Sequence, residues 1–163
     1  MVLTETFIHC LFLIVLANGA PVLSQKFLGG RFNQPVDFGF IFVDGKRLLG
    51  DSKTWRGLLA SLAITAPAAW LLGYEWQTGL LLALYSMLGD LLSSFIKRRM
   101  AMASSSMAPL IDQIPESLLP AWLLHEQFAL DVESIVILVG LFIVLELVLS
   151  RILYIWGIRR RPY

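Results

Sequence analysis

The residues with the clearest capacity for chemistry form a polar stripe along one apolar segment, residues 78–96, and its basic end. Its members recur at intervals of three and four positions, which places them on one face of a helix; they are Ser86, Asp90, Ser93, Ser94, Lys97 and Arg98. A helix would place Asp90 about 10 Å before Lys97. A charged group in a membrane interior costs about 2.5–3.5 kcal/mol, so Asp90 needs a function or a firm partner. A structural ion pair with a lysine of its own helix is the simpler alternative.

A second acidic group lies in residues 107–125, where Asp112, Gln113 and Glu116 accompany Pro115. Asp112 and Glu116 are four positions apart and therefore share one helix face. Pro115 lacks a backbone donor, and we expect irregular backbone there to line a cavity. The alternative for Asp112 is a loop carboxylate just outside the membrane.

Further polar residues are expected at the same level, near the inner side of the membrane: Asn18, Lys53, Thr54, Arg56, Glu146 and Arg151. For Glu146 and Arg151 the favoured interpretation is structural, a contact that ties the last apolar segment to the others. Carboxylates hold divalent metal ions, and Lys and Arg bind phosphates, so the mixture suits a half-open chamber for a polyanion and a metal. An ion conduit would carry polar residues through the whole membrane thickness, whereas the outer halves of three apolar segments are almost purely apolar.

The elements that must position these residues are apolar helices. Of the 163 residues, 57% are hydrophobic and 15% charged, and the mean hydropathy is +0.72, which does not suit a soluble domain. Cys10 is the only cysteine, which excludes a disulfide scaffold and leaves too few soft ligands for a zinc site. A bilayer core of about 30 Å needs about 20 helical residues. We therefore predict one all-α membrane domain, residues 1–163, with five transmembrane helices at about 7–23, 57–73, 78–96, 107–125 and 134–158.

The charged residues outside these spans indicate the orientation. Apart from Arg151, every Lys and Arg follows the first span, the third span or the last span. The alternate loops hold no Lys or Arg, and their charged residues are all acidic, namely Glu75, Glu126, Asp131 and Glu133. The positive-inside rule then places the N-terminus outside and the C-terminus and the long loop of residues 24–56 in the cytoplasm. Within that loop, Asp44-Gly45 between apolar runs is typical of a tight primed turn, so we expect a β-hairpin over residues 40–49.

These motifs resemble those of the archaeal CDP-archaeol synthases over nearly the whole chain. The resemblance is carried by residues 35–39 (PVDFG), 44–47 (DGKR), 50–57 (GDSKTWRG), 89–99 (GDLLSSFIKRR) and 112–116 (DQIPE). Residues 94–98 are also similar to the Ser-x-x-Lys-Arg part of the CDP-diacylglycerol synthase signature, whose paired aspartates are here reduced to Asp112 followed by Gln113.

The resemblance implies a multi-pass cytidylyltransferase of the cell membrane, with its active site facing the cytoplasm. Such an enzyme joins CTP to an unsaturated isoprenoid glyceryl ether lipid phosphate and releases pyrophosphate. Its partners would be CTP, the lipid phosphate and the bilayer, with no nucleic acid. Its cofactor would be Mg²⁺.

The resemblance also implies roles for individual residues. Asp90 and Asp112 would hold magnesium, and with Lys97 they form the expected catalytic set. The residues expected to bind phosphate are Lys53, Arg56, Lys97 and Arg98. Those expected to orient these groups or the nucleotide are Asp51, Thr54, Ser93 and Ser94, and further candidates are Asn18, Asp37, Lys46 and Gln113.

Three other function classes remain as alternatives. A small membrane transporter or ion channel would use the polar stripe as its pathway and would release no pyrophosphate from CTP. A CDP-alcohol phosphotransferase would carry the motif Asp-Gly-x-x-Ala-Arg, which this sequence lacks. A non-enzymatic assembly subunit would leave the carboxylates within the membrane unexplained.

Overall fold

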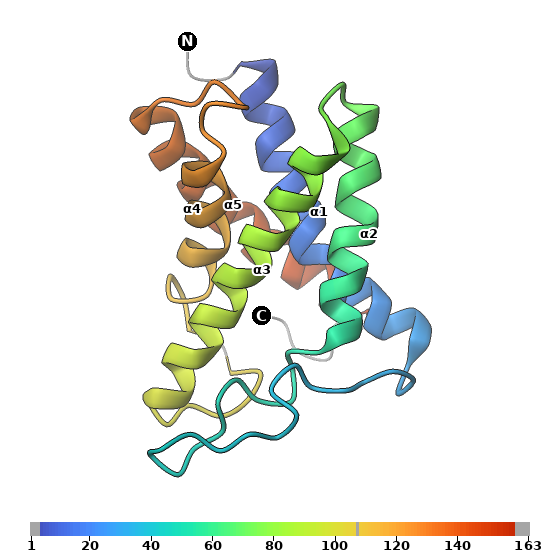
Figure 1. Ribbon diagram of the computed structural model, residues 1–163, viewed down its shortest axis with the longest axis vertical. Coiled ribbons are helices and arrows are strands. Elements are labelled where there is room, and N and C mark those ends of the chain that lie inside the picture. Colours follow the sequence, from blue (N-terminus) through green and yellow to red (C-terminus); the bar gives the residue numbers. More distant parts are fainter. Residues whose placement is uncertain (1–3, 107, 159–163) are drawn as a thin grey trace.

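Five α-helices dominate the part of the chain that the computed structural model describes, residues 4–106 and 108–158 (Figure 1). In chain order they are α1 (Glu5–Leu28), α2 (Trp55–Leu71), α3 (Trp76–Arg99), α4 (Gln113–Leu123) and α5 (Val132–Ile155). Each predicted apolar segment holds one helix, and these described residues contain no named strand. The prediction of an all-α fold is confirmed. The basic tail, Arg159 to Arg161, lies outside the described residues.

Polar side chains fix where two of the helices begin. Thr54 Oγ1 accepts a hydrogen bond from Gly57 N at 3.2 Å, and this contact starts α2. Asp131 Oδ1 accepts one from Ser134 N at 2.8 Å, and this contact starts α5. Both caps satisfy amide groups that have no partner inside their helix. Because Lys53 directly precedes Thr54, the cap of α2 also fixes the backbone beside that lysine.

Three helices are long and apolar enough to cross a membrane: α1, α3 and α5, each of 24 residues. α2 has 17 residues, and α4 has only 11, about 16 Å of helix. α4 is shorter than the predicted span of residues 107–125 because turns occupy residues 109–112 before it and 124–129 after it. Pro115 lies in the first turn of α4, where a missing N–H costs no helical hydrogen bond. The irregular backbone expected at Pro115 therefore lies just before the helix instead.

Two glycines let α3 approach its neighbours closely. A Cβ placed on Gly79 would lie 2.7 Å from the Cα of Ala66 on α2. A Cβ on Gly89 would lie 2.2 Å from the carbonyl oxygen of Pro115 on α4. Both positions therefore need a residue without a Cβ. The contact at Gly89, expected from its place beside Asp90, sets α4 directly against the polar stripe.

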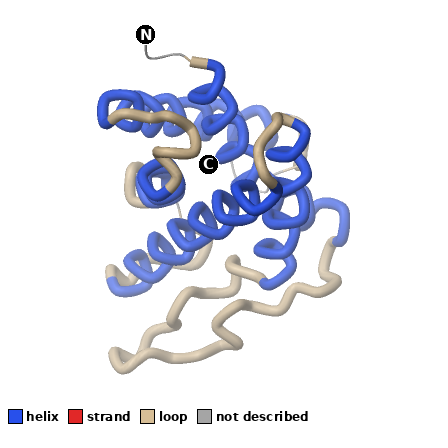
Figure 2. Tube along the Cα trace, turned by 45° about the horizontal axis from the view of Figure 1, so that its top comes forward, coloured by secondary structure: helices blue, strands red, loops and turns tan. Residues whose placement is uncertain are grey.

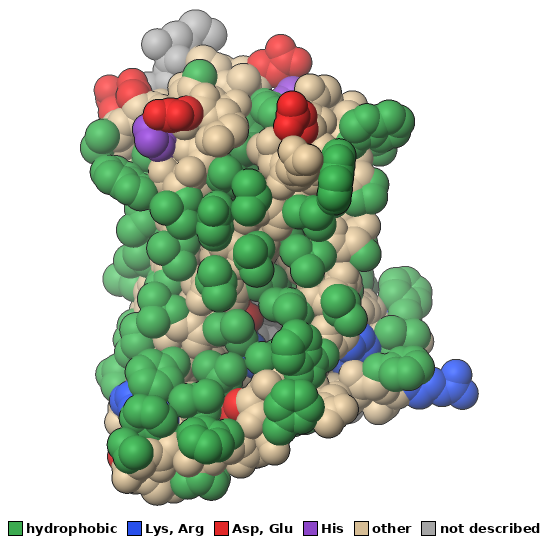
Figure 3. All heavy atoms as spheres, in the orientation of Figure 1, with side chains coloured by type: hydrophobic (Ala, Val, Ile, Leu, Met, Phe, Trp, Pro, Cys, Tyr) green, Lys and Arg blue, Asp and Glu red, His purple; other side chains and the backbone are tan. Residues whose placement is uncertain are grey.

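The outer surface of the helices is largely apolar. Exposed hydrophobic side chains run along α5, for example at Val136, Val144 and Val148. Figure 3 shows hydrophobic side chains over the flanks, acidic side chains at the end that carries the N-terminus, and Lys and Arg towards the opposite end. An apolar surface of this kind suits contact with lipid. The acidic and basic side chains lie towards opposite ends of the bundle, as their distribution along the sequence indicates.

The segment between α1 and α2 lies across the end of the bundle opposite the N-terminus (Figures 1 and 2). Its turn occurs where the hairpin was predicted: Gly45 N donates to Phe42 O at 3.0 Å, and Ile41 and Arg47 form an isolated antiparallel bridge. Gly45 has a φ of 76°, whereas Asp44 is not among the residues with positive φ. A primed turn needs a positive φ at its first central residue, so the turn is a longer loop ending on a left-handed glycine.

Candidate active site

A largely buried ion pair links the first loop to α3. Lys53 Nζ lies 2.5 Å from Asp90 Oδ1, and each side chain is 19% exposed. Asp90 sits in the body of α3, and Lys53 is held beside the cap of α2. The simpler alternative for Asp90 was an ion pair with Lys97, the lysine of its own helix. The structure instead gives Asp90 a lysine from another element.

Lys97 forms a second ion pair, with Asp112. Its Nζ lies 2.6 Å from Asp112 Oδ1 and also donates to the backbone oxygen of Ser106 at 3.1 Å. The other carboxylate oxygen of Asp112 accepts from Ala108 N at 3.1 Å. Asp112 is a turn residue immediately before α4, yet its side chain is mostly shielded from solvent. Both aspartates predicted to bind metal are therefore held by lysines in this structure.

Glu116 is a third carboxyl group in this cluster, and the predicted site residues did not include it. It is 8% exposed on α4, and its backbone nitrogen packs against Gly89. Its carboxyl group interacts electrostatically with Asp90 and with Lys53. The signal in the sequence was its four-residue spacing from Asp112, which places both acids on one helix face.

Gln113 connects this cluster to α5. Its Nε2 donates to Glu146 Oε2 at 2.7 Å, and its Oε1 accepts from Leu110 N at 2.8 Å. One contact that joins Glu146 to the rest of the bundle therefore comes from Gln113, and Arg151 is exposed. Gln113, a further candidate from the sequence, is a link between α4 and α5.

A cationic pocket of about 280 Å³ opens where the first loop meets the end of α3. Gly50 has a φ of 100°, and a Cβ there would lie 3.0 Å from Arg98 Nη1. A glycine thus lets the loop backbone reach the guanidinium. Two predicted phosphate- or nucleotide-binding residues, Asp51 and Arg98, share this pocket with the further candidate Lys46. Its lining consists of Lys46, Arg47, Gly50, Asp51, Arg98, Ala101, Met102 and Ser104.

Asp37 organises the loop from within. Its carboxylate accepts from Arg47 Nη2 at 2.8 Å and from the backbone nitrogens of Leu49 and Gly50, each at 3.0 Å. Burial alone favours the neutral acid, but Arg47 and the backbone amides outweigh it and hold the pKa of Asp37 below its usual range. Arg47 also pairs with the exposed Asp51 at 2.8 Å. Asp37 therefore shapes the cationic pocket through contacts inside the loop.

Arg56 is directed at the turn that follows α1. Its Nη1 donates to the backbone oxygens of Gly29 at 2.8 Å and Arg31 at 2.6 Å, and its Nη2 donates to Asn33 Oδ1 at 3.1 Å. The residue is buried. The contacts found for Arg56 in the described chain are thus with this turn, and the structure does not join this predicted phosphate ligand to the two ion pairs.

The other predicted residues line the inner faces of the helices. Ser93 Oγ donates to the backbone oxygen of Asp90 at 2.9 Å, and Ser94 is buried on the same helix. Asn18 Nδ2 donates to Ser86 Oγ at 2.8 Å, which ties α1 to the polar stripe. All six stripe positions are buried or partly buried, as their spacing predicts.

The donor chemistry of the two aspartates suits magnesium, which proteins bind through one or two carboxylates together with water and phosphate oxygens. Across residues 4–106 and 108–158, no group of three or more His, Cys, Asp or Glu side chains is arranged to hold a metal ion. Asp90 and Asp112 are each neutralised by a lysine instead. This arrangement fits an ion that arrives with a phosphate ligand better than a permanent metal centre made by protein alone.

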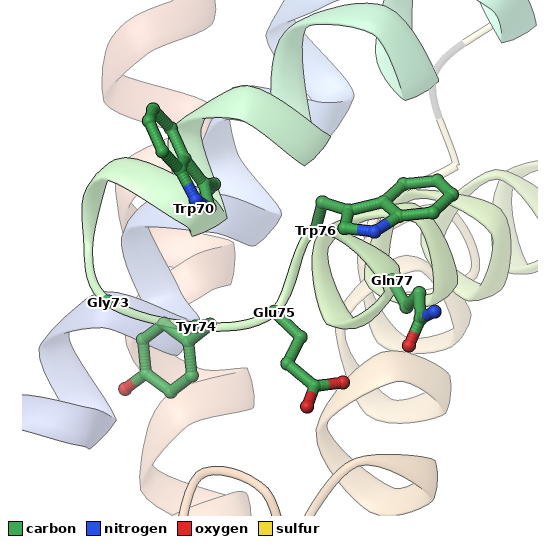
Figure 4. A pocket seen from close by; sticks show the side chains of 6 residues that line it. All are labelled: Trp70, Gly73, Tyr74, Glu75, Trp76 and Gln77. Atoms are coloured by element: carbon green, nitrogen blue, oxygen red, sulfur yellow. The ribbon is translucent and has the colours of Figure 1, made fainter.

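A larger pocket of about 470 Å³ lies at the turn between α2 and α3 (Figure 4). It is lined by Trp70, Gly73, Tyr74, Glu75, Trp76 and Gln77. The 17 residues of α2, about 25 Å of helix, separate this turn from Lys53. Aromatic residues at the ends of apolar helices are typical of a membrane interface, so we do not include this pocket in the candidate site.

The fold and the site together define a helical membrane protein with a buried cluster of acids and lysines beside a cationic pocket. The sequence model of the CarS-like family, described as CDP-archaeol synthase, matches residues 3–74 and 60–163. The chain belongs to this family, and the family recognised from its motifs is confirmed.

Individual relatives agree with this membership. The chain is 37% identical over 118 residues to the CDP-archaeol synthase of Pyrobaculum arsenaticum, covering 69% of this chain and 70% of that protein. It is 34% identical over 162 residues to that of Staphylothermus marinus, covering 91% and 87%. The alignment with the Thermofilum pendens relative spans half of that protein.

A solved structure described as an intramembrane enzyme for archaeal membrane lipids biosynthesis is also similar to this chain. The TM-score is 0.76 at 31% sequence identity, with 88% of this chain and 91% of that chain covered. The comparisons support a membrane cytidylyltransferase of archaeal lipid biosynthesis over a transporter or channel.

Proposed function

We propose that this protein transfers the cytidylyl group of CTP to the phosphate of an isoprenoid glyceryl ether lipid, giving a CDP-lipid and pyrophosphate. The observation that carries this proposal is the placing of two lysine–aspartate pairs beside a cationic pocket, in a member of the CDP-archaeol synthase family. The relatives named CDP-archaeol synthase supply the substrate class.

The chemistry asks for positioning more than for a base. An oxygen of the lipid phosphate attacks the α-phosphorus of CTP, the bond from that phosphorus to the bridging oxygen breaks, and pyrophosphate leaves. The nucleophile is already an anion. The main task is therefore to bring the lipid phosphate and the triphosphate of CTP together and to neutralise their negative charge. Lys53, Lys97 and Arg98 supply positive charge for this task. Asp90 and Asp112 hold the two lysines in place until the phosphates arrive.

We propose that Asp90 and Asp112 also hold magnesium when the triphosphate is bound. The ion would neutralise charge on the phosphates. For the residues of this chain, the consequence is that Lys53 and Lys97 exchange an aspartate partner for phosphate oxygens. Glu116 then remains beside Lys53 as a second carboxyl group.

We propose the five-helix topology with the N-terminus outside and the reaction on the cytoplasmic side. The separation of basic and acidic residues between the two ends supports this orientation. It can be tested by labelling a Lys46→Cys variant in intact cells, because the native Cys10 is buried. Modification by an impermeant external reagent would contradict the orientation.

The reaction is tested with purified protein, CTP labelled in the α-phosphate, and magnesium. Isoprenoid ether and diacyl glyceryl phosphates are compared as acceptors. We expect a labelled lipid product and pyrophosphate only when a lipid phosphate is present. The Glu133→Gln variant, changed at the acidic end, serves as the control and should keep this activity. No product with any lipid phosphate would refute the proposal.

A further inference from the structure

The residues that leave α1, Lys26 to Phe32, combine exposed aromatic side chains with basic ones. Phe27 is 83% exposed and Phe32 is 77% exposed, and Leu28 is also exposed. Lys26 and Arg31 lie exposed among them. We call these seven residues the basic aromatic segment. Large apolar side chains gathered on a surface mark a contact with a partner or with lipid.

The backbone of this segment is fixed, so the exposure of its side chains is built into the fold. The buried Arg56 binds the backbone oxygens of Gly29 and Arg31 and the side chain of Asn33. At the other end of the segment, Lys26 Nζ donates to the backbone oxygen of Gly157, beyond α5, at 2.8 Å. These hydrogen bonds hold the backbone on both sides of Phe27 and Phe32, whose side chains are exposed.

The charge of this segment is basic, since Lys26 and Arg31 are its only ionisable residues and the acids of the first loop are paired with arginines. Asp37 and Asp51 both pair with Arg47 at 2.8 Å, and Asp44 pairs with Arg99 at 3.0 Å. Figure 3 shows basic side chains beside hydrophobic ones at the lower right of the molecule. Such a surface complements anionic phosphate groups.

The helix that ends in this segment also exposes apolar side chains near its start. Ile8 and Phe12, earlier on the same helix, are about half exposed. α1 has 24 residues, more than the roughly 20 that a bilayer core needs. Its last turn therefore lies at the membrane surface, where aromatic and basic side chains are stabilised together.

We propose that the basic aromatic segment docks into the leaflet on the side of the candidate active site. Phe27, Leu28 and Phe32 enter the boundary between head groups and chains, and Lys26 and Arg31 meet the phosphates of anionic lipids. The docked segment sets the depth of the first loop, and so of Lys53, relative to the plane of the lipid phosphates. This docking is independent of the reaction proposed above.

The depth of the segment can be measured with spin labels in reconstituted protein. A Cys10→Ala background removes the native thiol, and single cysteines are placed at Phe27 and, separately, at Phe32. Two further single-cysteine variants calibrate the scale: Val144→Cys, 57% exposed on α5, as the lipid reference, and Glu133→Cys as the water reference. Collisions of each label with oxygen and with a water-soluble nickel complex are compared in anionic bilayers.

We expect the oxygen-to-nickel ratio at both positions to exceed that at residue 133 several-fold and to approach that at residue 144. The ratio should fall in zwitterionic bilayers and in an Arg31→Gln variant. Ratios equal to that at residue 133 would refute docking. Ratios that are the same in anionic and zwitterionic bilayers would refute the proposed contact with anionic lipids. Broadening between labels that disappears on dilution with unlabelled protein would assign the surface to a second copy and overturn the proposal. If one labelled variant does not fold, the other decides the test.

Discussion

Lys53 Nζ and Asp90 Oδ1, from residues 37 positions apart in the chain, lie 2.5 Å from each other. The pair joins the first loop to α3 at a place where both side chains are largely shielded from water. An ion pair in such a place adds little stability over an apolar pair, but loss of one member leaves an unbalanced charge. The pair is therefore better explained by a reaction that uses both groups than by stability alone.

The first prediction concerns the stability of this pair. Lys53→Met should destabilise the protein by about 3–5 kcal/mol, because Asp90 then loses its lysine. The double variant Lys53→Met with Asp90→Asn should recover most of that loss. Thermal unfolding in detergent measures both effects. Strictly additive losses in the double variant would show that the two side chains are not coupled.

The second prediction concerns the contact between α3 and α4. Gly89→Ala should be strongly destabilising or should displace α4, because its Cβ would meet the carbonyl oxygen of Pro115 at 2.2 Å. An overpacking cost of about 1–3 kcal/mol is the usual range, and rigid backbone on both sides favours its upper end. Gly140→Ala on α5 is the matched control, since no atom lies within 4 Å of its added Cβ. Equal unfolding temperatures for the two variants would contradict this packing.

The third prediction separates Arg56 from Lys53. Arg56→Ala should lower the free energy of unfolding by about 1.5–3 kcal/mol, because its charged hydrogen bonds hold the turn after α1. The folded fraction should keep its KM for CTP, whereas Lys53→Ala should raise that KM or lower kcat. A large rise in KM for Arg56→Ala at unchanged stability would return Arg56 to the phosphate-binding role implied by its motif.

The fourth prediction concerns acid stability. The pKa of Asp37 is lowered in the folded protein, so its ionised form contributes stability above the ordinary value of 3.8. That contribution is lost as the pH falls from about 4 through the lower folded-state value. Asp37→Asn should therefore be less stable than the wild type at pH 7, and the difference should narrow on acidification. Unfolding temperatures measured between pH 7 and pH 3 test this, and parallel profiles would contradict it.

Much of the helical fold could be predicted from the sequence, because the spacing of residues along a helix is a local property. The three- and four-residue spacing from Ser86 to Lys97 predicted the buried face of α3, and Gly89 marked the close contact with α4. The length of α4 was not predictable in the same way, since the residues just before it, 108–111, are also apolar. The turn at Gly45 depends on the φ of Asp44, which the Asp-Gly pair alone does not determine.

The partners within the site were harder to predict because they come from distant parts of the chain. Residue types identified Asp90, Lys53, Lys97 and Asp112, but spacing within one helix suggested the wrong partner for Asp90. The true partner depends on the path of the loop before α2, which the buried Asp37 helps to fix. Motif resemblance likewise grouped Arg56 with Lys53, although the two side chains bind different parts of the structure.

The central claim is that the pair of Lys53 and Asp90 belongs to the reaction centre. The most direct measurement is the rate of CDP-lipid formation by Asp90→Asn, and by the double variant Asp90→Asn with Lys53→Met, beside their unfolding temperatures. The account predicts that both variants lose at least about 10²-fold in rate, although the double variant unfolds close to the wild-type temperature. Near-normal turnover by the stable double variant would contradict the account, because the two side chains would then serve only each other.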